Sequence, residues 1–173
     1  FGNIILCGFM GSGKTSVGNR LAQTTGRTLV DMDRYIEQKE GMTVPEIFSA
    51  RGEAAFRTME REAAKELSLQ SGLIIATGGG ALMNPENTAA LKESGVIVLL
   101  DASAEAIRRR LSGDRSRPLL SGPDREETFW RLYSERTGAY RAAADLIVEA
   151  DGCINDVAEK VRKAVKIPLI QNK

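Results

Sequence analysis

Five short apolar runs that alternate with helical patterns restrict this chain to a small number of folds. The strand candidates are Ile4 to Cys7, Thr28 to Val30, Leu73 to Ala76, Val96 to Leu100 and Leu146 to Val148. Helical patterns lie near residues 14–24, 33–40, 43–49, 53–69, 85–93, 103–111, 124–142 and 154–165. This alternation is typical of βαβ units on a parallel sheet. We therefore predict an α/β fold in a single domain spanning residues 1–173.

Three helix starts have recognisable capping patterns. Thr43 to Glu46 and Asp124 to Glu127 have the spacing of a capping box, and Asn84 precedes a proline at the first helical position. Asp101 precedes Ser103 at a strand end, where we expect it to help start the next helix rather than bind a metal. The single Trp130 is expected in the core.

The chain carries 24 Lys and Arg, 23 Asp and Glu, and no His, which gives a net charge of +1. The absence of histidine excludes Ser-His-Asp and Cys-His catalysis and His-containing zinc sites, so a general base must be a carboxylate. The segment from Arg108 to Arg141 nevertheless holds nine arginines, no lysine and five acids. The nearly neutral total argues against a nucleic-acid partner. Arginine without lysine favours fork-shaped recognition of small anions.

The segment Gly8 to Thr15 fits the pattern G-x-x-x-x-G-K-[ST] and lies between an apolar strand and a helix. In such a loop, glycines let backbone N–H groups surround phosphate oxygens, and the helix N-terminus adds partial positive charge. Lys14 would neutralise the β- and γ-phosphates, and Thr15 would bind Mg²⁺. The alternative is a glycine-rich turn with a solvated lysine.

Two carboxylates, Asp31 and Asp33, follow the second strand candidate two residues apart. They would point to the same side of an extended chain, at the strand end where ligands of parallel sheets gather. One acid could hold the metal or its water while the other orients an acceptor hydroxyl. Asp33 could instead be the N-cap of the following helix.

Three consecutive glycines, Gly78 to Gly80, follow the third strand candidate. They favour a backbone platform on which a substrate or phosphate can approach closely, rather than a merely flexible turn. The segment 112–123 is rich in Gly, Pro, Ser and Arg and shows neither the helical nor the strand periodicity of apolar residues. We interpret it as a mobile lid.

Cys7 and Cys153 form no CxxC pair, so we expect a reduced intracellular protein with Cys7 in the core. No apolar run approaches the length of a membrane span, and no signal-peptide pattern opens the given sequence. Because residue 1 is Phe, we expect that an upstream part has been removed. The expected location is the cytoplasm, or a plastid if that part was a transit peptide.

Taken together, these patterns resemble the shikimate kinase family from Gly8 to about Asn155. The motifs that carry the resemblance are the GxxGxGKT loop, Asp31-x-Asp33, Arg51-Gly52-Glu53 followed by Phe56-Arg57-x-x-Glu60, Thr77-Gly78-Gly79-Gly80, and Arg117-Pro118-Leu119-Leu120 followed by Arg136-x-x-x-Tyr140. The loop alone is widespread, whereas the ordered set is specific. The resemblance implies a P-loop NTPase fold of three layers, α/β/α, with a five-stranded parallel sheet in the order 2-3-1-4-5.

The resemblance further implies ATP-dependent phosphorylation of the 3-hydroxyl of shikimate, on the pathway to chorismate and aromatic amino acids. It gives catalytic roles to Asp33, Lys14 and Arg117, the last swinging with the lid onto the transferring phosphate. The implied nucleotide-binding residues are Gly11, Ser12, Gly13, Lys14, Thr15, Ser16, Arg110 and Arg117, with Arg110 over adenine. Mg²⁺ would be bound directly by Thr15 and through water by Asp31.

Shikimate would be bound within residues 33–61 and by the glycines and helix that follow. The implied contacts are Asp33 with hydroxyls, Arg57 and Arg136 with the carboxylate, and Gly79 and Gly80 through their backbone. The implied partners are shikimate and ATP, with no nucleic acid or membrane, and a monomer is expected.

One departure from the family pattern lies in the loop 151–155, where many relatives place a proline or a longer polar side chain near adenine; here that contact is expected to be backbone only. Three other functions stay open. A kinase for nucleoside monophosphates or gluconate would share the architecture but need a different recognition pattern. A GTPase lacks support because the chain has no NKxD signature. A non-catalytic nucleotide-binding module is the third.

Overall fold

The predicted strands form one parallel sheet in the computed structural model, which describes residues 2–111 and 124–171. The strands are β1 (Asn3–Cys7), β2 (Thr28–Asp31), β3 (Leu73–Ala76), β4 (Gly95–Asp101) and β5 (Leu146–Glu149). Their order across the sheet is β2-β3-β1-β4-β5, and every pairing is parallel. The predicted strand order and α/β class are therefore confirmed.

All the predicted helices are also present. They are α1 (Lys14–Thr25), α2 (Met32–Glu40), α3 (Val44–Arg51), α4 (Glu53–Ser68), α5 (Pro85–Ser94), α6 (Ala104–Leu111), α7 (Arg125–Ala143) and α8 (Ile154–Ala164). A short 3₁₀ helix, η1 (Ala81–Met83), follows the glycine turn and was not predicted. Among the described residues, no helix is both long and apolar enough to span a membrane.

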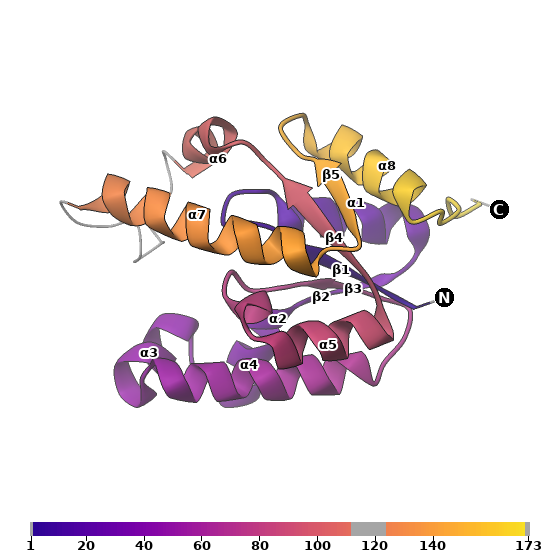
Figure 1. Cartoon of the computed structure of the whole chain (residues 1–173). Helices are drawn as coiled ribbons and strands as arrows, with labels where there is room; N and C mark the ends of the chain where they lie inside the picture. Colours follow the sequence, from indigo (N-terminus) through magenta and orange to yellow (C-terminus); the bar gives the residue numbers. More distant parts are fainter. Residues whose placement is uncertain (1, 112–123, 172–173) are drawn as a thin grey trace.

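The sheet lies between two layers of helices (Figure 1). Helices α1 and α8 pack against each other on one face, and α4 and α5 pack against each other on the opposite face. The central strand β1 is buried along its whole length, as expected where helices cover both faces of a parallel sheet. Its Cys7 is fully buried, which confirms the predicted core position.

The strand order brings three predicted site segments together. Strands β1, β2 and β3 are neighbours, with Leu6 and Asp31 both in register with Ala76. The predicted phosphate-binding loop, Gly8 to Thr15, follows β1, Asp31 and Asp33 lie at the end of β2, and Gly78 to Gly80 lie just after β3. They therefore meet at the carboxyl edge of the sheet, where a parallel α/β sheet binds its ligands.

The helix caps confirm some predictions and correct others. Thr43 and Glu46 form the full capping box, and Asn84 accepts from the Glu86 N–H. Asp124 makes no side-chain cap bond, so the second capping box was wrong. Asp31 is the residue that caps α2, accepting from Arg34, so Asp33 is not the cap.

Two further expectations about single residues were wrong. Asp101 does not start α6. It forms an ion pair with Arg141, and the hydroxyl of Ser103 accepts from the Ala106 N–H instead. Trp130 is 45% exposed rather than in the core. Its ring lies beneath the guanidinium of Arg108 at 4.4 Å, an arrangement that lets an aromatic ring stay at the surface.

Candidate active site

The loop between β1 and α1 has the backbone shape of a phosphate cradle. Gly8, Gly11 and Gly13 have positive φ angles of 153°, 80° and 97°, which glycine adopts without the strain that a Cβ would add. Lys14 folds over the loop, and its Nζ donates to the carbonyl oxygens of Gly8 at 2.7 Å and Phe9 at 3.3 Å. The ammonium group is thereby held above the loop.

The hydroxyl of Ser12 has no hydrogen-bond partner among the described residues, although Ser12 is only 1% exposed. A buried hydroxyl without a partner is costly unless a ligand satisfies it. This group therefore fits a loop that receives phosphate oxygens. Ser16 lies exposed in the first turn of α1.

Thr15 and Asp31, the two predicted magnesium-binding residues, meet at the edge of this loop. Thr15 Oγ1 donates to Asp31 Oδ2 at 3.0 Å, while Asp31 Oδ1 accepts from the Arg34 N–H at 3.2 Å. The hydrogen bond from Arg34 fixes the orientation of the Asp31 carboxylate. The two side-chain oxygens are hard donors of the kind that Mg²⁺ prefers.

Asp33 lies two residues after Asp31, in the first turn of α2, where it is partly buried. Burial is the largest cause that raises its pKa, the negative charges of Asp31 and Glu60 add to the increase and Lys14 opposes it, so that the pKa rises from 3.8 to about 6. A carboxylate with a pKa near neutrality is suited to accepting a proton. Its contact in the glycine turn is Gly78, where a Cβ atom would lie 2.5 Å from Asp33 Oδ1.

Arg57 is held on α4 by two carboxylates. Its Nη1 donates to Glu60 Oε1 at 2.8 Å, and its Nη2 donates to Glu53 Oε1 at 3.2 Å. Glu60 is 2% exposed, and burial raises its pKa despite the attraction of Arg57. The two bonds orient the guanidinium, and the i,i+3 and i,i+4 spacings that produce them are visible in the sequence.

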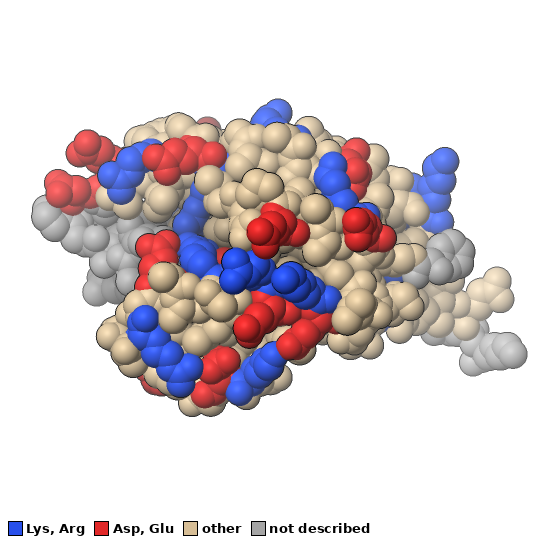
Figure 2. Space-filling model, turned by 60° about the horizontal axis from the view of Figure 1, so that its bottom comes forward, with Lys and Arg blue, Asp and Glu red and all other residues tan. Residues whose placement is uncertain are grey.

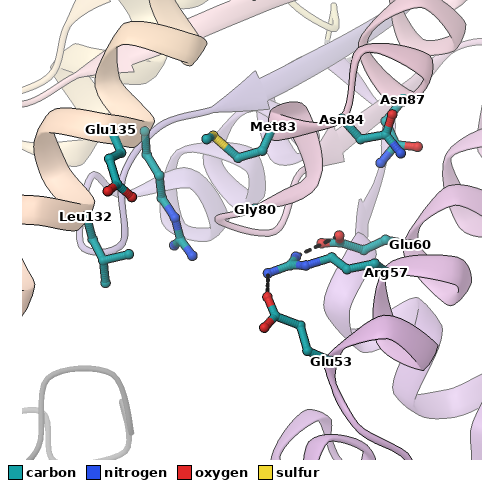
Figure 3. A pocket seen from close by; sticks show the side chains of 10 residues that line it. Glu53, Arg57, Glu60, Gly80, Met83, Asn84, Asn87, Leu132 and Glu135 are labelled. Atoms are coloured by element: carbon teal, nitrogen blue, oxygen red, sulfur yellow. Dashed lines mark hydrogen bonds and ion pairs between the residues drawn. The ribbon is translucent and has the colours of Figure 1, made fainter.

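A cavity of about 400 Å³ separates Arg57 from α7. It is lined by Glu53, Arg57, Glu60, Gly80, Met83, Asn84, Asn87, Leu132, Glu135 and Arg136. Figure 3 shows Glu53, Arg57 and Glu60 on one side, with Leu132 and Glu135 of α7 across the opening. The structure thus brings the two predicted arginines, Arg57 and Arg136, to one cavity.

The glycines make room for these arginines. A Cβ atom on Gly79 would lie 2.6 Å from Nη1 of Arg136, and one on Gly80 would lie 2.4 Å from Nη1 of Arg57. Neither glycine has a positive φ angle, so close approach rather than backbone shape explains the residue type. The approach of a substrate or phosphate to this turn stays a prediction.

Arg110 reaches the phosphate-binding loop, but through backbone carbonyls. Its Nη1 donates to the oxygens of Gly11 and Ser12, each at 3.2 Å, and its Nη2 donates to Ala150 at 2.7 Å and Gly152 at 3.3 Å. The side chain therefore joins the phosphate-binding loop to the loop 150–152. The family-based position of Arg110 over adenine stays a prediction.

Some predicted features cannot be placed, and some lining residues were missed. The lid at 112–123 and its Arg117 lie outside the described residues. Met83, Leu132 and Glu135 line the cavity but were not predicted, because an isolated apolar or acidic residue carries no spacing signal. The only sequence feature that pointed to Glu135 was its position directly before Arg136.

Comparison with known proteins places the chain in a family. Residues 10–166 match the family described as shikimate kinase. The chain is 43% identical over 162 residues to a shikimate kinase from Caldanaerobacter subterraneus subsp. tengcongensis, covering 94% of this chain and 95% of that protein. A shikimate kinase from Geobacter sulfurreducens is 42% identical over 165 residues, with coverages of 95% and 91%.

Solved structures agree with this assignment. The structure of an Acinetobacter baumannii shikimate kinase in complex with shikimate superposes with a TM-score of 0.90 at 38% identity, covering 96% of this chain and 93% of that one. A shikimate kinase from Aquifex aeolicus gives a TM-score of 0.83 at 34% identity, covering 95% and 96%. A sugar kinase from Janibacter, at 17% identity and a TM-score of 0.61, shares the fold alone. The chain belongs to the shikimate kinase family.

Proposed function

We propose that this protein transfers the γ-phosphoryl group of ATP to the 3-hydroxyl of shikimate. The observation that carries the proposal is the cavity that holds both Arg57 and Arg136 beside the glycine turn, with Asp33 against that turn. Two guanidinium groups fit the single carboxylate of a small acid. Asp33 lies near enough to Lys14 for the lysine charge to act on its carboxylate. This carboxylate could therefore orient the hydroxyl that receives the phosphoryl group.

The residues present fit MgATP. The partnerless hydroxyl of Ser12 and the N–H groups of Gly11 and Gly13 would receive phosphate oxygens, with Lys14 supplying positive charge. Thr15 would ligate Mg²⁺ directly and Asp31 through water, which agrees with their oxygen donors lying 3.0 Å apart. Bound Mg²⁺ supplies charge neutralisation on the phosphate oxygens.

The chain's own side chains would complete the transfer. Asp33 accepts the proton of the shikimate hydroxyl, a role suited to its raised pKa, and Arg57 and Arg136 orient the acid so that this hydroxyl faces the phosphate. Lys14 stabilises negative charge on the transferring group.

The proposed lid role of Arg117 can be tested by kinetics. We expect Arg117→Ala to lower kcat, and a change confined to the shikimate KM would contradict the lid role.

The decisive experiment is a coupled ADP-release assay with MgATP and four conditions: shikimate, gluconate, a set of nucleoside monophosphates, and no acceptor. ADP release that depends on shikimate is the expected result. Equal ADP release without shikimate would refute the proposal. Preference for gluconate or a nucleoside monophosphate would instead identify a related kinase on the same scaffold.

Other expectations remain proposals. Acidic and basic side chains are interleaved on the face shown in Figure 2, an arrangement more typical of a small-ligand enzyme than of a nucleic-acid binder. We expect a monomer that acts in the cytoplasm, with residues 33–61 as the substrate-binding part of one kinase domain. Light scattering on the purified protein would measure the oligomeric state.

A further inference from the structure

Tyr140 is a fully buried residue whose hydroxyl faces the glycine turn. It lies on α7 one helical turn after Arg136, so both side chains are on the same face of the helix. Its relative exposure is 0%, and its hydroxyl donates to the carbonyl oxygen of Gly79. One helix face thus contacts Gly79 twice, because Arg136 lies against the same glycine.

The hydrogen bond from Tyr140 fixes a peptide plane. The Gly79 carbonyl belongs to the peptide that links Gly79 to Gly80, and a trans peptide points its C=O and N–H in opposite directions. Holding the Gly79 oxygen towards Tyr140 therefore turns the Gly80 N–H away from Tyr140. Within this turn, Gly80 is the glycine that lines the cavity.

The Gly80 N–H also has no protein acceptor, among the described residues, that would compete with a ligand. By contrast, the neighbouring Ala81 N–H donates to Gly78 and the Met83 N–H donates to the Gly80 carbonyl. A peptide flanked by two glycines lacks the Cβ atoms that restrict its rotation. The local backbone therefore does little to hold this N–H in one direction.

We propose that Tyr140 is a positioning residue, which locks the Gly79–Gly80 peptide so that the Gly80 N–H donates to an oxygen of the acceptor substrate. The proposal rests on the proposed function for the identity of that substrate. Arg136 would bind the carboxylate while Tyr140, from the same helix face, sets the donor beside it. The sequence spacing Arg136-x-x-x-Tyr140 then has a physical reason, since i and i+4 residues project together.

The test compares Tyr140→Phe with Tyr133→Phe. Both variants remove one hydroxyl from α7 that donates to a backbone carbonyl, but Tyr133 donates to Ala102 at 3.4 Å, and neither residue lines the cavity. Phenylalanine keeps the ring and its packing. With saturating MgATP, we expect Tyr140→Phe to raise the shikimate KM by about 5- to 20-fold, while kcat changes less than about threefold. The ATP KM, measured at saturating shikimate, should also change less than about threefold.

A structural role would give a different result. Lower thermal stability with an unchanged shikimate KM would overturn the proposal, and so would equal KM increases in Tyr140→Phe and Tyr133→Phe. Amide NMR of the ligand-free protein provides a second readout. The Gly80 resonance should be single in the wild type and exchange-broadened or doubled in Tyr140→Phe, because a released peptide samples two orientations.

The NMR measurement separates this inference from the proposed function. If the wild-type protein does not use shikimate, the proposed function fails, and the Gly80 resonance still decides whether Tyr140 locks the peptide. A sharp, unshifted Gly80 resonance in Tyr140→Phe would overturn the inference alone.

Discussion

Asp33 and Gly78 are in such close contact that a Cβ atom on Gly78 would lie 2.5 Å from Oδ1 of Asp33. The two residues follow neighbouring strands, and the pairing of Asp31 with Ala76 sets the distance between them. The same Cβ would lie 3.3 Å from an oxygen of Glu60. Gly78 therefore leaves space for two carboxylates that would otherwise be displaced.

Replacing Gly78 with alanine should push the Asp33 carboxylate from its position. We expect kcat to fall by roughly 10- to 100-fold with a nearly unchanged ATP KM, because small displacements of a reacting group have large effects on rate. Steady-state kinetics would measure both constants. Gly138→Ala is the matched control, since nothing lies within 4 Å of a Cβ there. Similar kinetic losses in both variants would contradict a local effect on Asp33.

The raised pKa of Asp33 predicts the pH dependence of activity. If Asp33 accepts the substrate proton, kcat/KM should be constant at neutral pH and fall about tenfold per pH unit below a pH of about 6. A profile measured with shikimate between pH 5 and 8, at constant ionic strength, would test this. A profile that stayed flat down to pH 5 would contradict the prediction, because it would mean that the pKa of Asp33 stays nearer its ordinary value of 3.8.

Asp33→Asn should abolish turnover while leaving ATP binding nearly intact, because the amide cannot accept the proton. The variant should also be more stable at neutral pH. A folded-state pKa raised from 3.8 to about 6 makes ionisation of Asp33 destabilising, and this cost appears as pH rises through that window, reaching about 3 kcal/mol at most. Thermal unfolding at pH 7.5 and pH 3.5 should therefore show a stability gain only at the higher pH.

Arg136→Lys should weaken shikimate binding because an ammonium group cannot form the two parallel hydrogen bonds of a guanidinium. We expect the shikimate KM to rise at least about tenfold, with the ATP KM within about twofold. Arg141→Lys is the control from the same helix, since Arg141 pairs with Asp101 and does not line the cavity. A larger effect from Arg141→Lys would contradict the assignment of the carboxylate site to Arg136.

The fold was predictable because its signals are local and repeated. Each strand contains a short apolar run, and the structure extends most of these runs by only a residue at an end, such as Asn3 in β1 and Asp31 in β2. The exact ends of the helices and the residues that cap them were harder to predict. Asp31 and Asp33 are equally good caps by type, and only the geometry at the strand end decides that Asp31 bonds to Arg34.

The site was predictable where chemistry depends on spacing. The loop around Lys14 and the Asp31 to Asp33 pair were predicted in this way, whereas Arg57 and Glu60 came only from the resemblance to the family. Contacts between distant segments could not. The four carbonyls that Arg110 bonds come from two loops, and neither composition nor periodicity indicates which backbone oxygens a long side chain will reach.

Thr15 provides the test of the magnesium site. Thr15→Ala removes the hydroxyl that lies 3.0 Å from Asp31, so we expect the Mg²⁺ concentration for half-maximal activity to rise at least about tenfold. Thr15→Ser keeps the oxygen and should stay within about threefold of the wild type. Thr24→Ala is the control on the same helix, because its hydroxyl donates only to carbonyls of α1. Activity titrations with MgCl₂ at fixed ATP, after removal of metal with EDTA, would measure these shifts. If Thr15→Ala titrated like the wild type, Thr15 would not be a ligand of the metal, and the oxygen pair with Asp31 would only help to hold β2 against α1.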